Sequence, residues 1–171
     1  MTTHKNTCLC PVCMKQSIPK RCKSFRSTCP PKPPAPVCDC QLSGIHAQLI
    51  TGQDVYLGHG DEVIFNTIIN NRGGAVDMSA GVFSIKKKAN YLVNWSVAVE
   101  GCGAAPFVCF ALKVGNTIHS SAAIPVTIGM LSGSAFVTAD ENTYLALVNN
   151  THDTVRLQLL HPIANITIVS A

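Results

Sequence analysis

The chain of 171 residues is long enough to bury one hydrophobic core and to carry an additional segment. Charged residues make up 13% of it, against about 25% in typical soluble proteins, and its formal net charge is +4. No run of about 18 apolar residues is present to cross a membrane, and no apolar stretch near the N-terminus is typical of a signal peptide, so we expect synthesis in the cytosol without membrane insertion.

The first forty residues have a composition of their own. They hold seven of the ten prolines and have seven basic residues against one acid, a net charge of +6, whereas residues 41–171 have a net charge of −2. Proline at this density prevents a helix or a central strand, and CPPKPPAPVC (29–38) is expected to be an extended polyproline II spacer. We therefore divide the chain into a Cys/Pro-rich N-terminal connector arm, residues 1–40, and a head domain, residues 41–171.

Seven of the nine cysteines lie in the arm, which has too few apolar side chains to fold around a core. Disulfides are favoured there, because covalent closure stabilises such segments in oxidising surroundings. The odd total leaves at least one thiol per chain for a bridge between subunits, a metal or a free state. The alternative is zinc, since Cys10 and Cys13 have the spacing of two thiolates on one ion, although no second such pair follows. The candidates for disulfides between subunits are Cys8, Cys10, Cys13, Cys22, Cys29, Cys38, Cys40, Cys102 and Cys109.

Short apolar stretches separated by turn residues follow from Ile45 onward, and none keeps a helical period for three turns. Apolar side chains alternate in ANYLVNWSVAVEG (89–101), and FVCFALKVGNTIHSS (107–121) reads as a hairpin that turns at Gly115-Asn116. The expected core therefore includes Tyr91, Val93, Trp95, Val97, Val108, Phe110 and Leu112. The expected strands are 45–50, 63–69, 81–86, 89–99, 107–114, 117–122, 127–139, 143–149, 154–160 and 163–170.

Short strands at this spacing, without helices between them, predict an all-β antiparallel sandwich or barrel. Their outward positions carry mostly Ala, Ser, Thr, Asn and aliphatic residues, so we expect part of this surface to be buried between subunits. NNRGGA (70–75) predicts a hairpin turn, and GCGAAP (101–106), with Cys102, predicts another. Cys109 alternates with inward-facing residues, which directs its side chain away from the core or into a subunit interface, unless it is simply a buried thiol.

The order of these strands and turns resembles the C-terminal head of the BclA family, the collagen-like glycoproteins of the bacterial spore exosporium. The resemblance covers residues 45–171 and rests on FNTIINNRGGAVDMSAGVFSIKKKANYLVNWSVAVEG (65–101), FALKVGNTIHSSA (110–122) and YLALVNNTHDTVRLQLLHPIANITIVSA (144–171). It implies a tumour-necrosis-factor-like jelly roll that forms homotrimers about a threefold axis on a spore surface, after synthesis in the mother cell. Where those relatives have a Gly-X-Y stalk, this chain has the arm, which contains no glycine.

No catalytic site is expected. The six histidines form no H-x-H or H-x-x-x-H pair, the acid pairs lie in expected turns, and no nucleophile elbow or phosphate-binding loop is present. We therefore expect neither enzymatic activity nor a cofactor. The basic arm has a single aromatic residue, Phe25, for stacking on bases, so nucleic acid is not expected as a partner.

The sequence thus predicts a structural protein whose homotrimers polymerise head to tail through disulfide-forming arms. Together with the resemblance, this indicates an exosporium layer or an endospore appendage fibre, with a spore-surface anchor protein as a further partner. The alternative is a trimeric ligand-binding or adhesive head whose arm is a zinc-binding or nucleic-acid-binding tail.

Overall fold

Twelve β-strands and no helix are found in the residues that the computed structural model describes, which are 42–125, 128–159 and 161–171. Apolar and polar side chains alternate along most of them, as expected of strands with one face on a core. None of the described residues forms a helix able to cross a membrane. The strands are β1 Gly44–Leu49, β2 Tyr56–Leu57, β3 Thr67–Arg72, β4 Val76–Ser79, β5 Val82–Ile85, β6 Ala89–Cys102, β7 Phe107–Val114, β8 Thr117–Pro125, β9 Gly129–Ala139, β10 Tyr144–Asn149, β11 Val155–Leu157 and β12 Ala164–Ser170.

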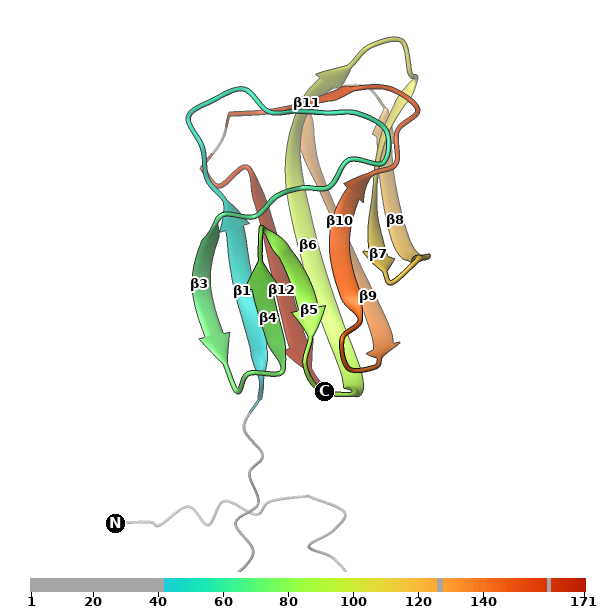
Figure 1. Cartoon of the computed structure of the whole chain (residues 1–171). Helices are drawn as coiled ribbons and strands as arrows, with labels where there is room; N and C mark the ends of the chain where they lie inside the picture. Colours follow the sequence, from blue (N-terminus) through green and yellow to red (C-terminus); the bar gives the residue numbers. More distant parts are fainter. Residues whose placement is uncertain (1–41, 126–127, 160) are drawn as a thin grey trace, which may run out of the picture. The chain divides into compact units, whose positions relative to one another are not determined.

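The strands form two antiparallel sheets that pack face to face (Figure 1). Sheet A has the order β2-β11-β6-β12-β1-β3, and β9 pairs with the free edge of β6; sheet B has the order β4-β5-β10-β7-β8. The long strand β6 organises sheet A, because it pairs with β12 and then β11 along one edge and with β9 along the other. Strands consecutive in sequence repeatedly change sheets, as in a jelly roll. The predicted all-β jelly-roll sandwich is confirmed.

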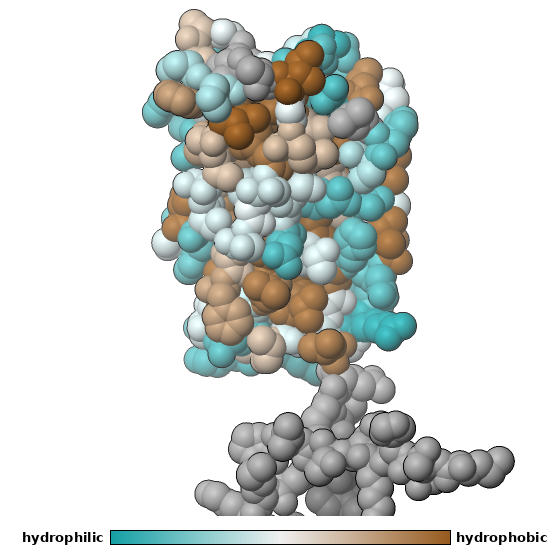
Figure 2. Space-filling view, turned by 180° about the vertical axis from the view of Figure 1, so that it is seen from behind, coloured by the Kyte–Doolittle hydropathy of each residue, from teal (hydrophilic) through white to brown (hydrophobic). Residues whose placement is uncertain are grey.

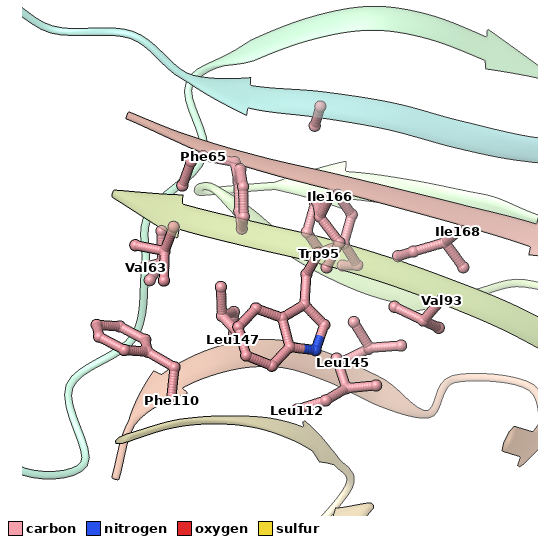
Figure 3. Packing of buried hydrophobic residues seen from close by; sticks show 14 of the residues in the cluster. Val63, Phe65, Val93, Trp95, Phe110, Leu112, Leu145, Leu147, Ile166 and Ile168 are labelled. Atoms are coloured by element: carbon pink, nitrogen blue, oxygen red, sulfur yellow. The ribbon is translucent and has the colours of Figure 1, made fainter. Parts of the chain in front are cut away.

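The core lies between the two sheets, and all seven residues expected there are buried. Trp95 of β6 projects from sheet A toward sheet B, where Figure 3 shows it among Phe110, Leu112, Leu145 and Leu147. Its neighbour on β9 is Gly133, where a Cβ would lie 2.5 Å from Cζ2 of the indole ring. The ring therefore occupies space that a side chain on β9 would otherwise take.

The prediction of a strand at 63–69 is wrong, because the strand in this region is β3, Thr67–Arg72. Val63 and Phe65 are buried, so the apolar alternation is real, but their amides donate to Leu147 and Gly81 on different segments rather than to one partner strand. Asn70, Asn71 and Arg72, which we expected in a turn, pair with β1 instead. An edge strand tolerates these polar residues because both of its faces are largely exposed.

Several other features differ from the sequence prediction; for example, β11 covers only Val155–Leu157 of the strand expected at 154–160. The hairpin expected at 70–75 is wrong: the turn at Gly73 and Gly74, which both have positive φ, connects β3 of sheet A to β4 of sheet B, and these two strands do not pair. Cys102 was expected in a turn but is the last residue of β6, where it pairs with Val155 of β11. The short strands β2 and β4 were not predicted, since two and four residues are too few to establish a period.

The turn between β4 and β5 contains a strained residue, Ala80, with φ of 50°. A Cβ in the left-handed region is disfavoured, so Ala80→Gly should stabilise the head by about 0.5–1 kcal/mol. Urea denaturation would measure this gain. The control is Ala123→Gly in strand β8, which removes a methyl group without relieving such strain and should destabilise; equal losses in both variants would contradict the expectation.

Candidate self-association surface

The outward face of sheet A carries three rows of cross-strand neighbours that contain no Asp, Glu, Lys or Arg. Each row crosses β9, β6, β12 and β1, and the residues between these positions on the same strands face the core. We call the twelve residues the ladder face. The rows are Phe136–Leu92–Val169–Gly44, Ser134–Asn94–Thr167–His46 and Ser132–Ser96–Asn165–Gln48.

Polar groups on the ladder face partly satisfy one another. Gln48 Nε2 donates to Asn165 Oδ1 at 2.8 Å, and Asn165 Nδ2 donates to Ser96 Oγ at 3.5 Å. The apolar row is open to solvent in the single chain, with Phe136 64% and Leu92 43% exposed. Figure 2 views this side and shows pale and brown surface across the middle and lower part of the sheet. Burying the ladder face against another copy has a low desolvation free energy, because no charged group loses its water and several side-chain amides already have hydrogen-bond partners.

A second uncharged surface adjoins the ladder face. The edge strands β8 and β9 of the two sheets meet along one side of the sandwich, where Ser120 Oγ donates to the Ser134 carbonyl at 3.2 Å. Neither strand contains Asp, Glu, Lys or Arg, and Ile118, Met130 and Phe136 are exposed along them. Long edge strands of monomeric proteins usually carry charges against unwanted pairing. The edge formed by these two strands, the β8–β9 rim, is therefore a second candidate contact surface.

Most of the candidate cysteines lie outside the part of the chain that the structure describes. Cys8, Cys10, Cys13, Cys22, Cys29, Cys38 and Cys40 lie outside the described residues. Cys109 of β7 is a half-buried free thiol, and Asn150 Nδ2 donates to its Sγ at 3.8 Å. Both backbone groups of Cys109 are hydrogen-bonded to Thr151: Oγ1 of Thr151 accepts from the Cys109 amide at 2.9 Å and donates to the Cys109 carbonyl at 3.2 Å.

Two hollows open where β6 ends, which is the end of the head opposite the C-terminus (Figure 1). The thiol hollow has a volume of about 480 Å³, and its wall includes Pro106, Phe107, Cys109 and His152. The tyrosine hollow has a volume of about 440 Å³, with Tyr56, Glu100, Thr154 and Arg156 in its wall. Asp153 lines both, so the two hollows adjoin.

The residues around the two hollows are mainly acidic, and they are joined by hydrogen bonds and ion pairs. Asp153 accepts from the Thr154 amide at 2.8 Å and from the Ala104 amide at 2.6 Å, and these bonds lower the pKa of its carboxyl. Arg156 donates to Asp54 at 3.0 Å and to Glu100 at 3.1 Å. Three carboxylates against one guanidinium leave this region with two net negative charges.

The buried side chain of Asn149 holds the loops around the hollows together. Its Nδ2 donates to the carbonyls of Leu57, Gly58 and Asp153, and its Oδ1 accepts from the Thr151 amide at 2.8 Å. These bonds connect the segment after β2 with the segment before β11. They give the hollows a fixed shape.

Asn149→Ala should destabilise the head by about 1–3 kcal/mol, because the buried Thr151 amide loses its partner. Chemical denaturation followed by circular dichroism would measure the change. Asn150→Ala is the matched control, since Asn150 is exposed and should change the free energy of unfolding by less than about 0.5 kcal/mol. Similar stability of both variants would contradict the role given to Asn149.

Sequence reasoning missed the contact between His59 and His152, whose rings stack with centroids 5.2 Å apart. The two residues are distant in sequence, so no spacing could indicate the contact. His59 Nδ1 lies 2.8 Å from the Thr151 carbonyl. Within the described part of the chain, no group of three or more His, Cys, Asp or Glu side chains is placed to hold a metal ion.

The sequence matches no protein-family model and no curated protein sequence. Several solved structures share its fold. The tumour necrosis factor Eiger from S. frugiperda is 14% identical, with 76% of this chain and 92% of that chain covered and a TM-score of 0.63. Murine APRIL is 10% identical, with 77% and 100% covered and a TM-score of 0.58. The globular domain of zebrafish complement 1qA protein is 14% identical, with 74% and 94% covered and a TM-score of 0.51. The chain therefore has a jelly roll similar to the tumour necrosis factor and complement C1q heads.

Proposed function

We propose that this chain is a non-enzymatic structural subunit that forms homotrimers through its head and polymerises through its cysteine-rich arms into a fibre or layer of the bacterial spore surface. The observation that carries the proposal is the ladder face. Twelve side-chain positions on four neighbouring strands contain no formal charge, in a region where an isolated soluble domain would expose several.

A threefold assembly needs two different surfaces that fit each other, because the contact in a cyclic trimer is heterologous. The ladder face and the β8–β9 rim meet this requirement. They adjoin at β9, both lack formal charges, and both expose large apolar side chains. In the proposed trimer the rim of each copy packs on the ladder face of the next, which buries the apolar row of Phe136, Leu92 and Val169.

Polymerisation beyond the trimer is assigned to the arms. Two thiols join with the loss of two electrons and two protons, which oxygen or a small-molecule disulfide accepts. Three arms act together in each trimer, so weak individual contacts become strong through effective concentration. The half-buried thiol of Cys109, at the end of the head opposite the C-terminus, is a suitable acceptor for an arm cysteine of another copy.

The spore surface is proposed from the residue pattern that resembles BclA-family heads. Synthesis in the mother cell and attachment to a spore-surface anchor protein belong to the same proposal. The similar structures support the jelly-roll head and add nothing about location.

Electron microscopy and gel electrophoresis of the full chain test this function. We expect filaments or sheets after oxidation, and bands larger than one chain on denaturing gels that collapse to the monomer when reductant is added. Replacing Cys8, Cys10 and Cys13 by Ser should give assemblies that dissolve in denaturant without reductant. A discrete trimer that persists under oxidation and binds one zinc ion per arm would contradict the structural role and favour the metal-binding tail.

A further inference from the structure

The two hollows at the end of β6 display aromatic side chains that no segment of the described chain covers. Tyr56 in the tyrosine hollow is 58% exposed, and Phe107 in the thiol hollow is 55% exposed. Ala104 and Pro106 line the thiol hollow beside Phe107, and Asp153 accepts a hydrogen bond from the Ala104 amide. The result is a fixed, aromatic-lined surface with acidic groups in its wall.

We propose that these adjoining hollows bind the proline-rich segment PPKPPAP, residues 30–36, of another copy of this chain. The inference rests on the proposed function and names the place where the arm of one copy meets the head of the next. Polyproline II segments bind aromatic-lined grooves, because their conformation is already ordered and their rings stack on flat side chains. The preformed walls around Asn149 and Asp153 lower the cost of ordering on the acceptor side.

Charge and hydrogen bonding fit this occupant. The segment has one basic residue, Lys32, and the walls of the hollows carry Glu100 and Asp153 against Arg156, which is one net negative charge. Asp54, which pairs with Arg156, adds a second negative charge nearby. An ammonium group beside the Tyr56 ring adds a cation–π contact. Proline has no N–H group, so the backbone carbonyls of the segment are not bonded within the segment itself. The side chains of Asn150 and Thr154 in the walls of the hollows can donate hydrogen bonds to these carbonyls.

Chain length favours the arm of another copy over the copy's own arm. Ser43 lies beside the beginning of β6. Ser170 is the strand partner of Tyr91, and the Ser170 amide donates to the Ser43 carbonyl. From Tyr91 to Cys102 the strand β6 advances by about 36 Å. The ten residues from Pro33 to Ser43 would span about 31 Å as polyproline II. The centre of the segment would then reach the hollows of its own head only along a straight path, with no length left to run around the surface.

The same holds within the proposed threefold trimer, since all three arms begin at the same end. We therefore place the acceptor in the next trimer along the axis. Assembly then has a direction: the arm end of one trimer meets the hollow end of another, and one of the two arm cysteines that flank the segment, Cys29 or Cys38, comes close to Cys109.

A photo-crosslinking experiment on the full chain tests this assignment. A benzophenone amino acid replaces Pro33 in one sample and Ala35 in a second. If one of these substitutions prevents assembly, the other sample still provides the test. Copies with natural nitrogen and copies with heavy nitrogen are mixed, assembled under oxidation and irradiated, and mass spectrometry locates the crosslinks. We expect crosslinks between light and heavy chains, at peptides that contain Tyr56 or Phe107.

The paired variant Tyr56→Ser and Phe107→Ser should lower the crosslink yield at these peptides at least tenfold. The matched control is Ile64→Ser and Ile68→Ser, which removes two exposed apolar side chains elsewhere on the head and should leave the yield within twofold. Crosslinks within one chain, or to the ladder face, in material that still forms assemblies would overturn this inference and leave the proposed function in place. Sedimentation of the same samples separates the two: if neither sample nor the unmodified chain forms assemblies beyond a trimer, the proposed function and this inference fail together.

Discussion

Trp95→Ala should lower the free energy of unfolding by about 3–5 kcal/mol, which is a large part of the stability of a typical domain. The indole ring is buried between the sheets (Figure 3). Gly133, its neighbour on β9, has no side chain that could move into the cavity. Urea denaturation followed by far-UV circular dichroism is the suitable measurement, because Trp95 is the only tryptophan and its fluorescence is lost in the variant.

The control for this prediction is Phe136→Ala, which removes an exposed aromatic side chain from the outward face of the same sheet. In dilute, monomeric protein it should cost less than about 1 kcal/mol. A loss for Trp95→Ala as small as that of the control would mean that the ring does not hold the sheets together.

Ser134→Lys should convert the proposed trimer to monomers while the head stays folded. Ser134 is exposed in the single chain and lies in the middle row of the ladder face, beside Asn94. In a trimer the substitution places three ammonium groups in an interface that offers no carboxylate, and unpaired charges of this kind cost several kcal/mol each. Light scattering at micromolar concentration would measure the mass, and circular dichroism would verify the fold.

Ser79→Lys is the matched control, because Ser79 is an exposed serine on β4, at the edge of sheet B farthest from β8. It should leave the mass unchanged. If both variants stay trimeric, the ladder face is not the contact surface; if both dissociate, the effect comes from added charge in general.

The sequence could predict those strands that bury one face and expose the other, because their apolar and polar residues alternate. In β6 and β7 the alternation identifies Tyr91, Trp95 and Phe110 as inward residues, because neighbours two apart share a side of a strand. At β3 the same reasoning fails. The alternation of Val63 and Phe65 belongs to a connecting segment that reaches both sheets, and the edge strand that follows is polar.

The candidate site was predicted only in outline. Outward Ser, Thr and Asn residues indicated a contact surface, but the rows of the ladder face depend on strand pairing between β1 and β12, which are more than a hundred residues apart. The hollows could not be predicted, because Asn149, Asp153 and Cys109 come together through tertiary contacts that have no local signature. The same holds for the histidine pair.

The mass of the full chain in reducing solution tests the central claim most directly. Sedimentation equilibrium at micromolar concentration should give a species of three times the 18.2 kDa chain mass, which does not depend on disulfides. A monomer under these conditions would contradict the homotrimer, the role of the ladder face and the assembly built on them.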